Sequence, residues 1–228
     1  MRRINASAHL SLCKVSHGRL PTAACDLAQL LDYKLLSSRF GEQCTLRVVR
    51  LMDEANWKSL LPVVENIFFA TSRIQIFADE QARNSFKAKW LDRYLNHYIG
   101  SFFVARADDG VLIGYLAGCL ENPTLNPLFN DLGYYKAFAP YCASYPCHLH
   151  INVAADYRNH GVGAALIAAF AAQASNIRAP GMHIVTNEGA RNIRFYERND
   201  FRILSTTHSN GMQVVFMGRQ LRQNSSAH

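Results

Sequence analysis

Arg158-Asn159-His160-Gly161-Val162-Gly163 is the stretch that decides the fold of this chain, because of the segments on either side of it. Residues 147–153, before it, favour a strand, and the alanine-rich residues 164–172, after it, favour a helix. A strand, a glycine turn and a helix start place free backbone N–H groups at the positive end of a helix dipole, which is a geometry that binds phosphate. Gly161 and Gly163 permit the positive φ and close ligand approach that such a turn uses.

The spacing of this motif distinguishes it from two common nucleotide-binding loops. It reads R-x-x-G-x-G, whereas a dinucleotide site has G-x-G-x-x-G and an acidic residue at the end of a following strand. It also lacks the Lys-Ser/Thr pair of a nucleoside triphosphate loop. The local pattern leaves two alternatives open, a phosphate-binding turn and a turn whose glycines are only structural.

Between residues 147 and 202 the sequence resembles the GNAT superfamily of acyl-CoA-dependent N-acyltransferases. Ile151-Asn152-Val153, then four intervening residues, then Arg158-Asn159-His160-Gly161-Val162-Gly163, is similar to the acetyl-CoA motif of the family. Phe195-Tyr196-Glu197 and Phe201 are similar to its last-helix signature. His148-Leu149-His150-Ile151 also resembles a bacterial group related to the acetyltransferase-like C-terminal domain of O-GlcNAcase.

The resemblance implies an α/β fold with a mixed, mostly antiparallel central sheet, splayed between its fourth and fifth strands and flanked by helices on both faces. It implies an N-acetyltransferase that moves an acetyl group directly from acetyl-CoA, its co-substrate, to an amine. The acceptor is then a small-molecule amine or an amine on a protein or peptide, and a homodimer is left open. The alternative from another class is a CoA-binding regulatory module with weak catalysis.

The resemblance also implies which residues hold acetyl-CoA. Main-chain groups of Ile151, Asn152 and Val153 are expected to pair with the pantetheine arm, and one N–H there to polarise the thioester carbonyl. The pyrophosphate is expected on the turn and the first helical turn: Arg158, Asn159, His160, Gly161, Val162, Gly163 and Ala164. The CoA-contacting asparagine of the family is Gly189 here, which leaves Asn187 or Asn192 as its replacement.

Two catalytic residues follow from the resemblance. Tyr196 is predicted to be the general acid that protonates the departing CoA thiolate, the alternative being a tyrosine that only packs. The general base of the family is often a carboxylate on the fourth or fifth strand, but residues 147–153 and 182–186 contain none. His150 is the substitute, because the pKa of histidine lies near neutral pH.

The assignment of His150 has a competing interpretation. His148 and His150 alternate on one face of a strand, and a paired H-x-H occurs on this strand in serotonin N-acetyltransferase. The pair here is displaced by one residue relative to the glycine motif, which reverses its face unless a bulge restores it. His150 is then a hydrogen-bonded core histidine. In the O-GlcNAcase-related group an aspartate often stands at the place of Asn152, and asparagine cannot accept a proton.

Composition is compatible with one such domain. The chain has 228 residues, 49% hydrophobic content and a formal net charge of +7, which suits a single core and a polyanionic ligand such as CoA. No Lys/Arg run of five or more is present, so the charge alone does not favour nucleic acid. The apolar run 164–172 is far shorter than the roughly 20 residues of a membrane span. The six cysteines form no C-x-x-C pair, so we expect reduced thiols, a cytoplasmic protein and no metal site.

Three regions are expected along the chain. Residues 1–43 are predicted to be a basic extension with a short helix over 21–36. Residues 44–222 are predicted to be the GNAT-like domain, and residues 223–228 a C-terminal tail.

Three further elements are expected inside this domain. A helix is expected over residues 79–99, and its aromatic stripe is assigned to the core. Residues 101–120 are expected to form a hairpin around an Asp-Gly turn. The aromatic, proline-rich connection 121–146 is either a lid over the acceptor pocket or a packed surface helix.

Overall fold

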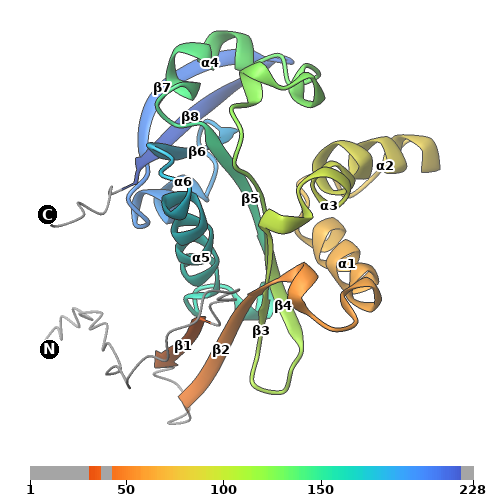
Figure 1. Cartoon of the computed structure of the whole chain (residues 1–228). Helices are drawn as coiled ribbons and strands as arrows, with labels where there is room; N and C mark the ends of the chain where they lie inside the picture. The colour runs from red at the N-terminus through yellow and green to blue at the C-terminus, as the bar shows by residue number, and fades with distance from the viewer. Residues whose placement is uncertain (1–30, 37–42, 222–228) are drawn as a thin grey trace, which may run out of the picture.

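A mixed sheet of eight strands forms the centre of the structure, a computed structural model that describes residues 31–36 and 43–221 (Figure 1). The strands lie in the order β1-β2-β3-β4-β5-β6-β8-β7. All neighbours are antiparallel except β5 and β6, which are parallel. The strands are β1 (Leu31–Leu36), β2 (Gln43–Arg50), β3 (Phe102–Arg106), β4 (Leu112–Cys119), β5 (Cys147–Val153), β6 (Gly181–Asn187), β7 (Arg202–Ser209) and β8 (Met212–Gln220).

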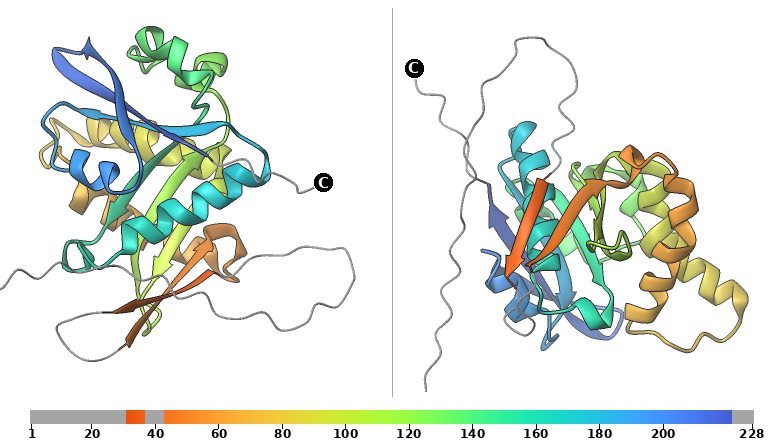
Figure 2. Two further views of the ribbon diagram at one scale, coloured as in Figure 1. Left: turned by 90° about the vertical axis from the view of Figure 1, so that its left-hand side faces the viewer. Right: turned by 90° about the horizontal axis from the view of Figure 1, so that it is seen from below.

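Helices cover both faces of this sheet (Figure 2). One face carries α1 (Leu61–Thr71), α2 (Glu80–Lys87), the π-helical turn η3 (Ala88–Asp92), α3 (Arg93–His97) and α4 (Tyr135–Cys142). The other face carries α5 (Val162–Asn176) and α6 (Ile193–Glu197). Single turns of 3-10 helix complete the described elements: η1 (Leu51–Asp53), η2 (Trp57–Leu60), η4 (Ile99–Ser101), η5 (Pro123–Leu125), η6 (Pro127–Phe129) and η7 (Ala155–Tyr157).

The core has two halves, one on each face of the sheet. Side chains of a strand alternate between faces, so Phe102 and Val104 of β3 pack towards α1 and α3, whereas Phe103 and Ala105 pack towards α5. Because both faces are covered, β3 and β4 are apolar and buried along nearly their whole length. The hairpin predicted over residues 101–120 is confirmed as β3 and β4.

The helix α5 lies directly against the sheet. Its buried side includes Leu166 and Phe170, both fully buried. The Phe170 ring fits over Gly118 of β4, where an added Cβ would lie 2.3 Å from a ring carbon. A larger residue at that position would lift the helix off the sheet. Within residues 31–36 and 43–221, no helix has both the length and the apolar character needed to cross a membrane.

The sheet opens between β5 and β6, which is the splay that the resemblance predicts. The two strands pair only at their first residues, Cys147 with Met182 and His148 with His183. β4 continues to pair with β5 as far as Val153, whereas β6 turns to pair with β8 along its whole length. Among the described residues, the second half of β5 therefore has a neighbouring strand on one edge only.

The N-terminal part of the prediction needs a correction. Residues 31–36 are strand β1, paired with β2, so that part of the predicted helix over 21–36 is wrong. Residues 21–30 lie outside the described residues. The strands predicted as fourth and fifth become β5 and β6, because β1 adds one strand to the sheet. The domain boundaries at residues 43/44 and 222/223 stay predictions. β1 precedes the first of them and forms an edge strand of the sheet.

The helix predicted over 79–99 is confirmed as α2, η3 and α3, and its aromatic stripe contributes to the core. Tyr94 and Leu91 are each 1% exposed. η3 shifts the helical register by one residue within this stripe. The result is that Trp90 and Tyr94 both reach β5, where their rings contact His150.

The connection 121–146 is folded and packed rather than loose. Its α4 buries Tyr135 and Phe138, and Phe129 is 1% exposed. An ion pair fastens it to α3, with the Arg93 guanidinium 2.7 Å from the Asp131 carboxylate. These contacts favour the packed-helix alternative over the lid.

Candidate active site

The open edge of β5 is the first component of the site. Ala154 N–H donates to the Ile113 carbonyl of β4, 2.9 Å away. Main-chain groups of successive strand residues point to opposite edges, so those of Asn152 also face β4. Those of Ile151 and Val153 face the splay. The predicted pantetheine contacts are therefore available at Ile151 and at the N–H of Val153, whose carbonyl accepts from Arg158. The main chain of Asn152 is directed towards β4.

The turn after β5 is the second component. Asn159 and Gly161 both have positive φ, 65° and 80°, and Gly161 is the N-cap of α5 without a side-chain cap. Alternating backbone conformations of this kind turn successive N–H groups towards one point, and the first turn of a helix adds its own free N–H groups. Those of Val162, Gly163 and Ala164 are in that first turn. His160 is exposed beside them. The arrangement suits an anion at this helix end.

Arg158 and Gly163 have packing roles that the motif does not reveal. The Arg158 Nε–H donates to the Val153 carbonyl at 3.1 Å, which folds this side chain back onto the end of β5. At Gly163, an added Cβ would lie 2.7 Å from the ring of Phe195 on α6. This glycine therefore lets α6 pack closely against the first turn of α5.

Tyr196 lies on α6 and is 6% exposed. Its ring contacts Phe195 and Phe201, with centroid separations of 5.1 and 5.4 Å. Burial raises the pKa of its hydroxyl well above the ordinary value. The phenol therefore holds its proton at neutral pH, as a general acid must before it acts.

The two asparagines predicted to replace the CoA contact differ in position. Asn192 is the N-cap of α6, and its side-chain carbonyl accepts a hydrogen bond from the Thr186 hydroxyl at 3.0 Å. Asn187 is the last residue of β6 and is half-buried. Gly189, between them, has a φ of 70° and open space around it, so glycine serves the turn there. Both asparagine roles stay predictions.

Histidines line the face of β5 that α1, α3 and α4 cover, opposite to the α5 face. His148 is 2% exposed, and neither of its ring nitrogens has a hydrogen-bond partner among the described residues. The Phe129 ring lies 4.6 Å from it, and the Tyr94 and Tyr135 rings lie about it at 6.0 and 6.1 Å. His183, on β6, bonds the Tyr135 hydroxyl at 3.2 Å. These rings form a closed aromatic layer under α3 and α4.

His150 is the half-buried member of this row and lies nearest the splay. The rings of Trp90 and Tyr94 lie edge-on to it at 5.4 and 5.3 Å. Burial, with a further contribution from Arg93, lowers the pKa of His150 to about 4. Its imidazole is therefore neutral at neutral pH, with a free lone pair but weak basicity. β4 and β5 pair without a register shift, so no bulge restores the displaced face.

One contact at the splay links residues far apart in the chain. The Asn152 side-chain N–H donates to the hydroxyl of Thr71, the last residue of α1. The two are separated by 81 positions, and no local pattern marks Thr71. The sequence therefore carries no signal that places Thr71 at the site.

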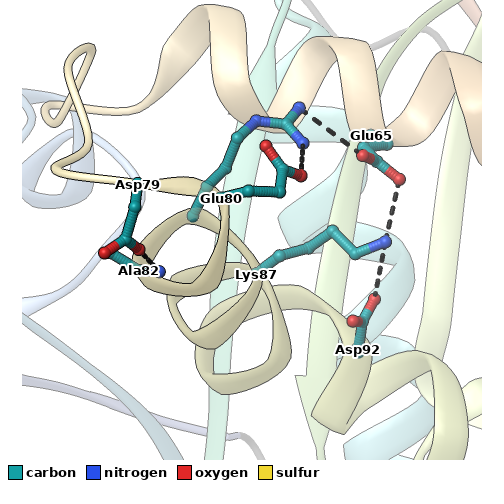
Figure 3. Close-up of polar contacts among 7 residues, drawn as sticks. Glu65, Asp79, Glu80, Ala82, Lys87 and Asp92 are labelled. Carbon is teal, nitrogen blue, oxygen red and sulfur yellow. Dashed lines mark hydrogen bonds and ion pairs between the residues drawn. The ribbon is translucent and has the colours of Figure 1, made fainter.

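The outer side of α1 carries a polar network and a groove, both distinct from the splay. Glu65 of α1 pairs with Lys87 at 2.9 Å and with Arg83 at 3.6 Å, both on α2, and the Asp79 carboxylate caps α2 by accepting from Ala82 N–H at 2.7 Å (Figure 3). The groove, of about 380 Å³, is lined by Phe69, Ala70, Ile74, Gln75, Phe77, Asp79, Glu80 and Arg83. No residue of β5 or β6 lines it.

Comparison with known proteins agrees with this geometry. Residues 99–203 match the model of the acetyltransferase (GNAT) domain family. No curated protein sequence matches the chain. Among solved structures, SsHAT is similar, with 20% identity over 78% of this chain and 98% of its own and a TM-score of 0.60. PH1933 from Pyrococcus horikoshii OT3 is also similar, with 14% identity over 78% and 99% and a TM-score of 0.53. At these identities the two structures bear on the fold alone.

Proposed function

We propose, from the premise that this chain belongs to the GNAT acetyltransferase family through residues 99–203, that it transfers an acetyl group from acetyl-CoA to an amine. The observation that carries the proposal is the juxtaposition of the splay, the positive-φ turn and the start of α5. Open main-chain groups of β5 lead directly to a cluster of backbone N–H groups at a helix N-terminus. A long ligand with a peptide-like arm and a pyrophosphate fits such a line of donors and acceptors.

Each part of the site has a role in this reaction. The Ile151 and Val153 main chain holds the pantetheine arm and polarises the thioester carbonyl. The turn of Arg158 to Ala164 holds the pyrophosphate, with Asn187 or Asn192 as a further contact. Tyr196 supplies a proton to the leaving thiolate, and His150 is the residue placed to accept a proton from the amine.

A second candidate is a CoA-binding regulatory module with weak catalysis. The favouring observation is that β5 and β6 carry no carboxylate, and that the pKa of His150 is lowered to about 4. Such a module would keep the ligand site and lack turnover.

Acetyl-CoA binding is the first test. At a concentration one hundred times its dissociation constant, acetyl-CoA should stabilise the fold by about 2.7 kcal/mol. The measurement is thermal unfolding with acetyl-CoA, with ATP as the control for a phosphate effect. A melting curve that acetyl-CoA leaves unchanged contradicts both candidates. Release of free CoA thiol in the presence of a panel of amines then separates them, because only the acetyltransferase depends on the amine. The acceptors to compare are small amines and peptides with free N-termini or lysines.

A further inference from the structure

Asn152 presents a side-chain amide at the start of the splay. The residue is half-buried and stands between Ile151 and Val153, whose main-chain groups face the open edge. Its side chain lies on the α1 face of the sheet, two residues beyond His150 and opposite Tyr115 of β4. This side chain therefore lies between the two residues whose main-chain groups are proposed to hold the pantetheine arm.

The Asn152 amide has a fixed orientation because Thr71 determines it. The Thr71 hydroxyl lies 2.7 Å from the Ile67 carbonyl of α1. A carbonyl oxygen can only accept, so the hydroxyl proton is committed to Ile67. The hydroxyl oxygen can then only accept from Asn152, which assigns the Nδ2 amide group to that contact. The carbonyl oxygen Oδ1 of Asn152 is consequently left for another donor.

The anchor of this contact is itself held in place. α1 packs against β4 and β5 through Val64, Ile67 and Phe68, all buried. On its outer side, Glu65 is tied to Lys87, which also contacts Asp92 of η3 at 3.6 Å (Figure 3). Thr71 therefore belongs to a helix that is fixed on two sides.

We propose that Asn152 Oδ1 accepts one N–H of the attacking amine and so orients its lone pair towards the thioester carbon, and that this contact selects a primary amine over a secondary one. This inference rests on the proposed acetyl transfer. An asparagine carbonyl cannot take the proton, so it acts by geometry, in the way that fixed groups convert a loose encounter into an aligned one. Thr71 is a positioning residue, because it acts through Asn152.

The balance of the reaction explains the preference for a primary amine. The C–N bond forms and the C–S bond breaks, and the thiolate takes the proton of Tyr196. The amine loses one proton to His150, which passes it to water, and Tyr196 is reprotonated from water. The N–H held by Asn152 stays on nitrogen and becomes the amide N–H of the product. A secondary amine has one N–H only and must lose it, so it cannot keep this hydrogen bond through the reaction.

The test compares a primary amine that the wild-type protein acetylates with the N-methyl derivative of the same amine. Asn152→Leu is similar in size and has no acceptor, so kcat/KM for the primary amine should fall by about 10-fold to 100-fold. The value for the N-methyl derivative should change little, so the preference for the primary amine collapses. Asn152→Asp keeps an acceptor oxygen and should keep that preference. The dissociation constant of acetyl-CoA should stay the same in both variants, because main-chain groups of Ile151 and Val153 bind it.

Thr71 gives an independent arm of the test. Thr71→Val frees the Asn152 amide to rotate, so kcat with the primary amine should fall by about 3-fold to 10-fold, within the range of one lost hydrogen bond. Thr71→Ser restores the hydroxyl and should restore kcat. Asn66→Leu, at an exposed position of the same helix, is the matched control and should leave all values unchanged.

The outcomes separate this inference from the proposed function. If none of the amines in the panel causes the wild-type protein to release thiol, the proposed acetyl transfer is wrong. This inference is then wrong as well. If the wild type is active but Asn152→Leu keeps the preference for the primary amine, only the role of Asn152 is wrong. Equal loss in Asn152→Asp and Asn152→Leu overturns it as well, because the acceptor oxygen then has no effect.

Discussion

The two faces of β5 are built in different ways. On the α5 face, the turn of residues 158–163 runs directly into the first turn of α5, and packing between Gly163 and Phe195 adds α6 with its Tyr196. On the α1 face, Asn152 and His150 meet Thr71 of α1 and Trp90 of η3, from distant parts of the chain. The first face relies on main chain, and the second relies on side chains. Under the proposed function, the α5 face would recognise the constant ligand acetyl-CoA, and the α1 face would distinguish the acceptor.

The largest effect is expected for Tyr196, the residue proposed as general acid on the α5 face. Tyr196→Phe keeps the buried ring and removes the hydroxyl, so turnover should fall by roughly 100-fold or more, the scale of general acid catalysis. The melting temperature and the dissociation constant of acetyl-CoA should change little. Steady-state thiol release measures the turnover. Thermal unfolding with and without acetyl-CoA measures the melting temperature and the binding of acetyl-CoA. A variant that loses stability but keeps its turnover number would show that the hydroxyl is structural, and the acid would have to be sought elsewhere.

A smaller effect is expected from steric change on the same face. Gly163→Val places a side chain within 2.7 Å of the Phe195 ring, so the free energy of unfolding should fall by about 1–3 kcal/mol. Loss of acetyl-CoA binding in this variant would then combine steric block with displacement of α6. The matched control is Gly133→Val, because an added Cβ there meets nothing within 4 Å. Urea unfolding of both variants checks this, and equal stabilities would contradict the packing role of Gly163.

The smallest effect is expected on the α1 face and depends on pH. Burial and neighbouring charges lower the pKa of His148 well below its ordinary value of 6.5, so the unfolded chain binds more protons than the folded one below about pH 6.5. The free energy of unfolding should therefore fall as the pH drops from 7 to 5. His148→Phe removes this ionisation and two unpaired buried nitrogens, so it should be within about 1 kcal/mol of wild type at pH 7 and more stable than wild type at pH 5.

The free energy of unfolding of His148→Phe should still fall as the pH drops, but less steeply than that of the wild type. The pKa of His150 is lowered to about 4 and that of His183 to about 3, mainly by burial, so both favour the neutral form in the same way. Urea unfolding at pH 5, 6 and 7 measures the difference between the two proteins. Parallel pH curves for wild type and His148→Phe would show that His148 contributes nothing to acid destabilisation.

The α5 face could be predicted from sequence because its information is local. A strand, a turn with Gly161 and an apolar helix follow one another between residues 147 and 176, and each has its own pattern. The splay followed from the same resemblance, and the short β5–β6 pairing confirms it. The packing role of Gly163 was hidden because its neighbour, Phe195, is far along the chain.

The α1 face could not be predicted in the same way. The contact between Thr71 and Asn152 spans 81 positions, and neither residue carries a pattern that identifies the other. His150 was placed on the right strand, but its pKa depends on burial by Trp90 and Tyr94 and on the charge of Arg93. Residues 31–36 were predicted as helix because leucines dominate the local pattern, whereas pairing with β2 decides their strand conformation.

The short pairing of β5 with β6 has a consequence for how this sequence can diverge. The proposed recognition of acetyl-CoA at Ile151 and Val153 depends on peptide groups, which every residue except proline supplies in the same form. Substitution of one β-branched or apolar residue by another there leaves the donors and acceptors intact, so drift at these positions is limited by packing alone. Asn152, between them, has no such freedom, since its contribution lies in the side chain. Three adjacent codons are thus expected to tolerate change to very different degrees.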